Sequence, residues 1–186
     1  MKKSNKILSL FLSTVVLLNI ASLNTFAATN DTKTEFSSLE EFAASNTAEL
    51  EAQGMEIIGG KAEVVTILNP LTRAKMQVYV DWDIAYSPSS GIGLCSYTRA
   101  YSTNLNCLLK KITGTFSWED IADSDSGSYK INTSQIVPTY QITDAIETRD
   151  RFPSGTLVDC AALGDVGAVS EISGGKFNYS DTVTIP

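Results

Sequence analysis

Short runs of β-branched and aromatic residues, separated by turn-forming residues, fill the sequence from Met55 to the C-terminus. Val, Ile, Thr, Tyr and Phe favour strands, whereas Gly, Pro, Asn, Asp and Ser favour the turns between them. The runs do not alternate with helical segments, so a parallel sheet built from strand–helix–strand units is not expected. The pattern predicts a mainly β fold, either an antiparallel β-sandwich or a barrel-like sheet.

Nine or ten strands are expected, at a spacing of roughly 8–12 residues. Gly59-Gly60 separates the first two and has the composition of a two-residue hairpin turn. Segment 171–176 resembles segment 56–61, with Gly174-Gly175 in the equivalent position. Two Gly-Gly hairpins in one sheet explain this similarity more simply than a duplicated half-domain. The expected strands cover residues 55–58, 62–68, 75–84, 93–101, 108–118, 128–132, 135–143, 156–162, 168–172 and 176–185.

One short N-terminal α-helix is expected before the strands, at about residues 38–53. Ser38 and Glu41 have the spacing of a capping box, with Ser37 and Glu40 as the alternative, and Gly54 can end the helix. An apolar stripe at helical spacing predicts that the helix packs on the body of the domain; a partner-binding helix is the alternative. The stripe consists of Leu39, Phe42, Ala43 and Leu50.

The N-terminus has the three parts of a secretory signal peptide. Basic residues at 2, 3 and 6 precede an apolar stretch over 7–23, and small residues follow it. Thr25 and Ala27 fit a peptidase that cuts after Ala27. Polar residues interrupt the apolar stretch, which argues against a membrane anchor. We therefore expect a signal peptide at 1–27 and a single mature domain at 28–186, secreted and without a stable membrane anchor after cleavage.

Charge and the absence of histidine exclude several classes of function. Cleavage after Ala27 leaves 11 basic and 21 acidic residues, a net charge of −10. Such an acidic protein is repelled by nucleic acids and anionic lipids, so neither is an expected partner. The chain contains no His, which excludes Ser-His-Asp hydrolases, Cys-His proteases and ordinary His-ligated zinc sites.

Cys95, Cys107 and Cys160 are candidates for a disulfide because an exported protein enters an oxidising compartment. An odd number leaves at least one thiol without an intramolecular partner. If residues 102–106 form a hairpin tip, Cys95 and Cys107 lie on the order of 20 Å apart along the ladder, too far to bond. Either 96–106 is an irregular loop or Cys160 supplies a partner, and the connectivity stays open.

Two acidic groups are candidates for catalysis. On a strand over 77–84, Asp81 and Asp83 share a face with Tyr79, about 7 Å apart, a separation that suits acid–base chemistry on a glycosidic bond. Glu119 and Asp120 form the second group. Carboxylates on one strand point in the same direction and do not straddle a bond well, so a solvated strand face is the alternative interpretation.

Asp123, Asp125 and Gly127 resemble the opening of a calcium-binding loop. The complete loop needs a Glu six residues after the Gly, where this chain has Thr133. Calcium is therefore only a weak candidate, an exposed acidic loop explains the segment more simply, and no other cofactor is expected.

Aromatic residues on neighbouring strands suggest a binding surface. Tyr97, Arg99 and Tyr101 alternate onto one face of a strand, and Tyr79 lies on the strand before it. Flat rings beside a guanidinium can form a platform for a glycan or a protein. The alternative is that tyrosines simply favour strands. Residues 108–112 contain two lysines, which are too few for a membrane contact in an acidic chain.

These observations favour a secreted, non-catalytic binding or interaction protein whose partner is an extracellular glycan, a wall polymer or a protein surface. A secreted toxin or antimicrobial protein that acts on competing cells is a second possibility. A carboxylate-dependent glycoside hydrolase is the third.

Overall fold

The structure is a computed structural model that describes residues 35–68, 73–87, 93–104, 107–168 and 174–186. Glu35–Pro186 form one unit. The expected signal peptide at 1–27 lies outside the described residues, so it stays a prediction. Among the described residues, no helix is both long and apolar enough to cross a membrane.

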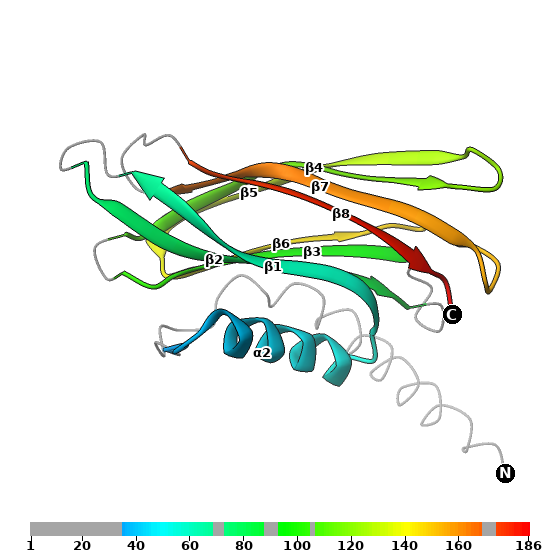
Figure 1. Cartoon of the computed structure of the whole chain (residues 1–186), viewed down its shortest axis with the longest axis horizontal. Helices are drawn as coiled ribbons and strands as arrows, with labels where there is room; N and C mark the ends of the chain where they lie inside the picture. The colour runs from blue at the N-terminus through cyan, green and yellow to red at the C-terminus, as the bar shows by residue number, and fades with distance from the viewer. Residues whose placement is uncertain (1–34, 69–72, 88–92, 105–106, 169–173) are drawn as a thin grey trace, which may run out of the picture. The chain divides into compact units, whose positions relative to one another are not determined.

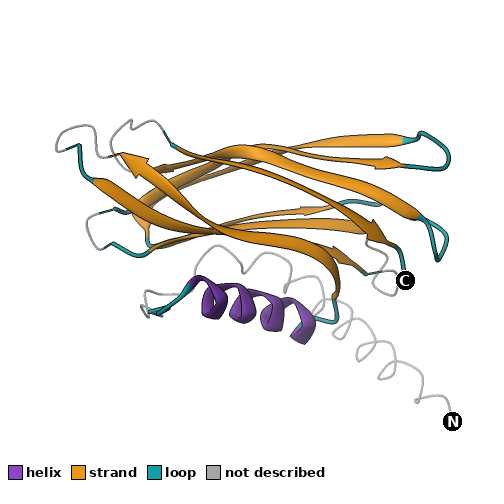
Figure 2. Cartoon of the chain, viewed as in Figure 1, coloured by secondary structure: helices purple, strands orange, loops and turns teal. Residues whose placement is uncertain are grey.

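Within the described residues, one helix precedes eight long strands (Figures 1 and 2). The expectation of a mainly β fold with one N-terminal helix is confirmed. The elements are α2 (Leu39–Ala52), β1 (Glu56–Leu68), β2 (Lys75–Tyr86), β3 (Leu94–Ser102), β4 (Leu109–Asp120), β5 (Ser126–Thr139), β6 (Gln141–Glu147), β7 (Leu157–Ala168) and β8 (Gly175–Thr184).

The strands form two four-stranded antiparallel sheets. The first sheet has the order β1-β2-β3-β6 and the second has the order β5-β4-β7-β8. The two sheets stack face to face as a sandwich, and α2 lies on the outer face of the first sheet (Figure 1). Each sheet therefore has one face in the core. The first sheet is covered again by α2, whereas no described helix or strand covers the outer face of the second sheet, which we call its open face.

Apolar side chains from the inner faces of both sheets form the core. Along β2, alternation sends Val78, Val80, Trp82 and Ile84 inward, and all four are fully buried. The Trp82 ring stacks on Tyr179 of β8, with ring centroids 5.9 Å apart and an interplanar angle of 11°. This pair therefore joins the two sheets through their largest buried side chains.

Acidic side chains join the sheets along both edges of the sandwich. At one edge, Asp181 of β8 accepts a hydrogen bond of 3.0 Å from the Gly60 amide of β1. At the other edge, Asp144 of β6 accepts from the Asn132 amide at 3.0 Å and from the Thr133 hydroxyl at 2.7 Å, both on β5. Edge strands have backbone amides with no neighbouring strand to accept their hydrogen bonds. The two carboxylates accept from such amides and so link one sheet to the other.

The expected hairpin at Gly59-Gly60 is wrong, because β1 runs without interruption through both glycines. Ile57 pairs with Ala85 and Gly59 with Ile84, so Ile58 is an extra residue in a bulge. Gly60 has a φ of 149°, which favours glycine, and a Cβ on Gly59 would lie 2.5 Å from a methyl carbon of Val183. The glycines allow the bulge and the close approach of β8, rather than a turn.

Two expected strand breaks are absent. β5 continues through the expected break between 132 and 135 but ends at Thr139, so the expected strand 135–143 is divided between β5 and β6. β7 runs without a break from Leu157 to Ala168. Residues 169–172 of the last expected segment lie outside the described residues. Gly175 pairs with Val166 inside the β7–β8 ladder, so Gly174-Gly175 is not a two-residue turn. Glycine within a strand is compatible with pairing, and here it does not mark a strand end.

The limits of α2 agree with the capping prediction. The Ser38 side chain accepts a hydrogen bond from the Glu41 amide at 3.2 Å, and Gly54 has a φ of 80° beyond the last turn. The Glu41 carboxylate accepts from the amide and hydroxyl of Ser37 rather than from the amide of Ser38. The helix packs on the domain through Phe42, Asn46 and Leu50, which are buried at a spacing of four residues.

The expectation of a disulfide is corrected, because all three cysteines are free and buried. Cys95 lies on the outer face of β3, in a cluster with Leu50 of α2. Cys107 and Cys160 are both in the sandwich core, but at opposite ends of β4. Cys107 lies just before Leu109, the first residue of β4, whereas Cys160 pairs with Trp118, nine residues further along that strand. Cys107 and Cys160 are therefore on the order of 30 Å apart, too far to form a disulfide.

The expected hairpin tip at 102–106 is also wrong. β3 belongs to the first sheet and β4 to the second, so the connection between them crosses from one sheet to the other. Residues 105 and 106 lie outside the described residues. Residues 96–102 belong to β3 rather than to an irregular loop, which places Cys95 and Cys107 in different layers of the protein.

Candidate functional site

The structure brings the predicted binding tyrosines and the first carboxylate pair together on one face. In the β2–β3 ladder, Tyr79 is opposite Tyr101, Asp81 is opposite Arg99, and Asp83 is opposite Tyr97. Alternation points these side chains away from the sandwich core and toward α2. We call this surface, with the residues of α2 that lie on it, the covered face.

The helix buries this face almost completely. Arg99 is 2% exposed, and Tyr97 and Tyr101 are each 5% exposed. The expectation that these aromatic residues form an exposed platform is therefore corrected: they pack beneath α2. Their role in binding stays a prediction, and Tyr79, the remaining predicted binding residue, is half-buried.

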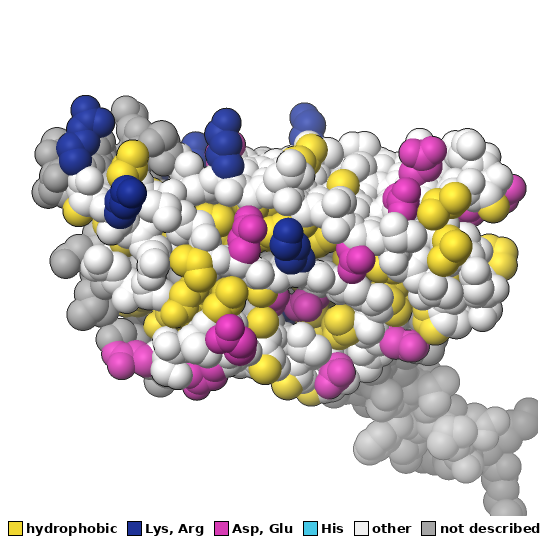
Figure 3. Space-filling model, in the orientation of Figure 1, with side chains coloured by type: hydrophobic (Ala, Val, Ile, Leu, Met, Phe, Trp, Pro, Cys, Tyr) yellow, Lys and Arg dark blue, Asp and Glu magenta, His cyan; other side chains and the backbone are white. Residues whose placement is uncertain are grey.

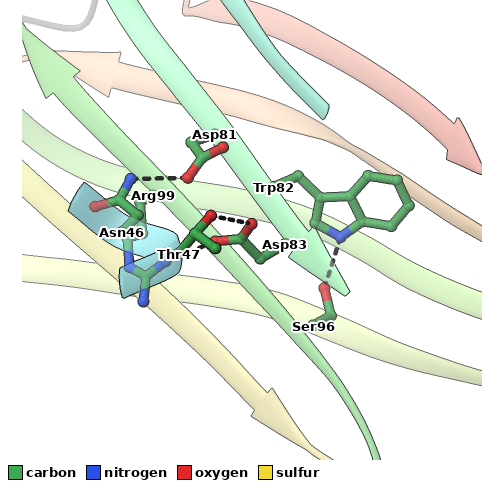
Figure 4. Close-up of polar contacts among 7 residues, drawn as sticks. All are labelled: Asn46, Thr47, Asp81, Trp82, Asp83, Ser96 and Arg99. Atoms are coloured by element: carbon green, nitrogen blue, oxygen red, sulfur yellow. Dashed lines mark hydrogen bonds and ion pairs between the residues drawn. The ribbon is translucent and has the colours of Figure 1, made fainter. Parts of the chain in front are cut away.

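A network of polar side chains lies at the centre of the covered face (Figure 4). The Asn46 side-chain amide donates to Asp81 at 2.8 Å, and the Arg99 guanidinium donates to Asp83 at 2.9 Å. The Thr47 hydroxyl donates a longer bond of 3.5 Å to Asp83. Buried carboxylates need such partners, because an unpaired charge in this environment costs several kcal/mol. The network therefore ties α2 to β2.

The charges of this network do not cancel. Two carboxylates, Asp81 and Asp83, share a single guanidinium, that of Arg99. Burial, helped by the neighbouring charge of Asp83, raises the pKa of Asp81 to about 7. Burial also raises the pKa of Asp83, although Arg99 opposes the rise. Asp81 therefore exchanges its proton near neutral pH, and this changes the charge beneath α2.

Aromatic packing closes one end of the covered face. Phe42 of α2 lies 5.7 Å from Tyr101 and 6.3 Å from Tyr79, measured between ring centroids. Phe36 meets Tyr101 edge to face at 5.0 Å. Near the other end, the Tyr97 hydroxyl donates to Glu147 at 3.0 Å. Edge-to-face and offset ring contacts are favourable, so these rings stabilise the position of the helix.

Sequence reasoning missed Asn46, the residue through which α2 contacts Asp81. Its signal is a polar side chain in the middle of an apolar stripe, four residues after Phe42 and four before Leu50. Asn is neither apolar nor charged, so a search for apolar periodicity or for acidic clusters passes over it. A buried Asn at such a position indicates a polar partner on the surface that the helix covers.

The second acidic group lies on the other sheet. Glu119 and Asp120 end β4, and the β4–β5 hairpin carries Asp123 and Asp125. The Asp120 carboxylate accepts from the amides of Ala122 at 2.9 Å and Asp123 at 3.4 Å, which orders the turn. This pair is therefore separate from Asp81 and Asp83, and the structure does not bring the four catalytic candidates together.

The acidic hairpin does not assemble a cluster of metal-ligating side chains. Within the described part of the chain, no three or more His, Cys, Asp or Glu residues lie close enough to hold a metal ion. The Asp125 carboxylate accepts from the Ser126 amide at 3.0 Å. Calcium binding at Asp123 and Asp125 accordingly stays a prediction.

The open outer face of the second sheet contains a hollow of about 830 Å³. Four small residues form a transverse row across its floor, and the ladders place each directly opposite the next: Ser128, Ser117, Ala161 and Ser180. Small side chains leave space above the sheet that larger neighbours would fill. We call this depression and its lining residues the open-face hollow.

Acidic side chains border the hollow on one side. Glu119 lies opposite Asp159, and Asp159 accepts a hydrogen bond of 2.6 Å from the Thr182 hydroxyl. Leu163 is not part of the lining; it lies two residues beyond Ala161 on the same strand and exposes an apolar side chain. The hollow itself therefore offers hydroxyls and carboxylates to a ligand, and its border is negatively charged.

Comparisons with known proteins do not place the chain in a family. No protein-family model matches the sequence, and no curated protein matches it. Among solved structures, the chain is similar to a Bordetella pertussis protein provisionally described as ApaA, with 8% identity and a TM-score of 0.33. The match covers 70% of this chain and 97% of that one. A similarity this low supports no conclusion about fold or function.

Proposed function

We propose that this protein is a secreted, non-catalytic binding protein that holds a glycan in the open-face hollow. The observation that carries the proposal is the row of small residues across an otherwise wide, uncovered sheet, bordered by Glu119 and Asp159. Ligand sites are concave and combine apolar surface with a few polar groups of fixed direction. The strands hold these side chains at a regular spacing, so the hollow is formed before a ligand arrives.

The chemistry of the hollow suits a neutral or amine-bearing sugar. Sugar hydroxyls both donate and accept hydrogen bonds, and the serine hydroxyls and carboxylates of the hollow match them. Glu119 and Asp159 repel anionic polymers and attract amino groups. Leu163, which is about half exposed, can contact the apolar face of a sugar ring.

The arrangement of carboxylates supports binding rather than hydrolysis. Glu119 and Asp159 lie opposite each other on neighbouring strands and project from the same side of the sheet. A glycosidase needs its two carboxyl groups on either side of the scissile bond. Asp81 and Asp83 are buried and engaged by Asn46 and Arg99. The hydrolase and toxin alternatives stay predictions; the glycan assay below also tests the hydrolase, because it measures the release of reducing ends.

A glycan panel applied to the secreted protein tests the proposal. We expect saturable binding to at least one neutral or amino-sugar glycan, without release of reducing ends. Ser117→Ile fills the floor of the hollow and should weaken binding by roughly tenfold or more, since it removes a hydroxyl and the space above it. The matched control is Ser134→Ile on the exposed end of β5, outside the hollow, which should bind like the parent. Absence of saturable binding, or equal binding by the two variants, contradicts the proposal.

Export is tested separately, because the expected leader lies outside the described residues. Protein recovered from the medium of an expressing cell should begin at Ala28, as measured by intact-mass spectrometry, since cleavage after Ala27 is expected. Retention of the chain in the cell, or a mass that includes residues 1–27, contradicts secretion by this route.

A further inference from the structure

A four-residue bulge carries the most exposed large apolar side chains of the described residues. In the β4–β5 ladder, Ser134 pairs with Lys111 and Thr139 pairs with Leu109, so residues 135–138 of β5 oppose the single residue between them on β4. Ile136 is 98% exposed and Val137 is 75% exposed. A large bulge lifts its residues away from the sheet. We call residues 135–138 the apolar tip.

Two adjacent aliphatic side chains at this level of exposure need an explanation. Single exposed apolar residues are ordinary on protein surfaces. Here the backbone departs from the ladder at a neighbouring pair, Ile136 and Val137, which is followed by Pro138. The bulge therefore displays the pair rather than merely failing to bury it.

Two lysines lie beside the tip, and further basic residues lie elsewhere at the same end of the sandwich. Lys110 of β4 lies directly opposite the apolar tip and has no paired residue in either the β4–β5 or the β4–β7 ladder. Lys111 follows it, and both side chains are exposed. Lys75 at the start of β2 and Lys176 near the start of β8 belong to the same end of the sandwich, where these strands begin and β5 ends. Arg73 precedes Lys75 and is also exposed. Several of the Lys and Arg side chains in Figure 3 lie toward the upper left of the molecule.

We propose that this end of the sandwich docks on an anionic lipid bilayer, with Ile136 and Val137 in the interface and Lys110 and Lys111 at the level of the headgroups. Aliphatic side chains partition into the boundary between headgroups and acyl chains, and lysines beside them are attracted to anionic lipids. Long lysine side chains reach the headgroups while neighbouring apolar groups insert. This surface is separate from the open-face hollow, so the proposal does not rest on glycan binding.

The acidic residues at the far end of β4 do not prevent this contact, because they are distant from the tip. Glu119 lies eight residues from Lys111 along β4, about 27 Å at 3.4 Å per residue. Salt screens exposed charges over about 8 Å at physiological ionic strength, so a bilayer at the tip responds mainly to the nearby lysines. The expectation from net charge alone treats the molecule as uniform, whereas Lys110 and Lys111 give the surface beside the tip a local positive charge.

Acidic residues near this end set the direction of approach. Asp165 lies opposite Lys176 on the outer face of the second sheet. Glu40 and Glu41 occupy the first turn of α2, on the far side of the first sheet. The two lysines beside the tip, Lys110 and Lys111, lie on the second sheet, and we expect α2 to face away from the bilayer.

A second copy of the chain fits the tip less well. Strand-to-strand pairing at the β5 edge is obstructed by the bulge and by Pro138, which has no amide hydrogen to donate. A two-fold contact centred on the tip would also place Lys110 and Lys111 against the same residues of the other copy. Both arguments favour a surface of opposite charge over self-association.

Vesicle flotation tests the proposal with the protein as released into the medium, its N-terminus verified by mass spectrometry. Vesicles of phosphatidylcholine alone are compared with vesicles that also contain phosphatidylglycerol. We expect the protein to float with the anionic vesicles, less so as salt is increased. Ile136→Ser combined with Val137→Ser should weaken binding by roughly tenfold or more, and Lys110→Gln combined with Lys111→Gln should remove most of the salt dependence.

Matched controls distinguish this contact from nonspecific hydrophobic adsorption to the vesicles. Leu157→Ser removes another exposed apolar side chain, at the opposite end of the sandwich from the tip, and should float like the parent. An Ile136→Trp variant should shift its fluorescence emission to shorter wavelength on anionic vesicles, because the indole enters the interface. Absence of flotation, equal flotation of the tip variant and the parent, or a tip-dependent dimer in sedimentation without vesicle binding overturns the proposal.

Discussion

The side-chain amide of Asn46 donates a hydrogen bond of 2.8 Å to the carboxylate of Asp81, and this contact joins α2 to the centre of β2. Both residues are buried, so neither can replace the other with water. The helix therefore does not simply cover the first sheet with apolar side chains; it also satisfies a carboxylate that would otherwise be costly to bury.

Removing Asn46 should destabilise the domain. Asn46→Ala leaves the Asp81 carboxylate without its closest donor, and we expect a loss of about 2 kcal/mol in the free energy of unfolding at pH 8. Ser45→Ala, on the exposed side of the same helical turn, is the matched control and should change stability by less than about 0.5 kcal/mol. Urea denaturation measures both, and equal stabilities of the two variants would show that the contact contributes nothing.

The raised pKa of Asp81 should make stability depend on pH. A pKa of about 7 in the folded state, above the ordinary value of 3.8, means that the folded protein binds this proton more tightly than the unfolded chain. The resulting stabilisation is complete below the unfolded pKa and disappears as the pH rises through about 7. Relative to Asp81→Asn, the parent should therefore lose on the order of 2 kcal/mol between pH 5 and pH 8. If the free energy of unfolding changed with pH equally in parent and variant, a residue other than Asp81 would be responsible.

Gly60 should tolerate substitution less well than Gly155. Both have positive φ values, 149° and 85°, so alanine strains the backbone at either position. A Cβ on Gly60 would also lie 2.3 Å from the Trp82 carbonyl oxygen, whereas nothing lies within 4 Å of one on Gly155. We expect Gly155→Ala to cost about 1 kcal/mol and Gly60→Ala at least twice that, by thermal denaturation. A reversed order would contradict the described bulge in β1.

The three thiols should be present but unreactive in the folded protein. Burial raises the pKa values of Cys95 and Cys160 to about 12, so very little thiolate exists at neutral pH. Iodoacetamide should leave native protein largely unmodified and should add three groups after denaturation without reductant. Mass spectrometry counts the additions, and a single addition in the denatured sample would reveal a disulfide.

Much of the fold is predictable from the sequence, and the failures have a common cause. The ends of β3 and β4 agree with the predicted strands to within two residues, because alternating runs there are bounded by turn residues. At Gly59-Gly60, and between 162 and 168, glycine-containing segments continue as strand. Glycine permits both a turn and a close approach between strands, and only the tertiary neighbours, here Val183 and Trp82, decide between them.

The candidate sites were predictable in part. Alternation correctly places Asp81 with Asp83, and Tyr97 with Arg99 and Tyr101, on single strand faces that the ladder then brings together. The position of α2 over that face does not follow from the helical stripe, because the stripe shows which side of the helix is buried but not what buries it. The open-face hollow depends on register between strands distant in sequence, such as Ser117 opposite Ala161.

Amide chemical shifts during a glycan titration test the central claim most directly, because they distinguish the open-face hollow from the covered face. Using the glycan that binds best in the panel, we predict saturable shifts of the amides of Ser117, Ser128, Ala161 and Ser180, with those of α2 unchanged. Shifts confined to α2 and to Tyr97, Arg99 and Tyr101 would instead place the ligand on the covered face and contradict the account, as would the absence of any saturable shift.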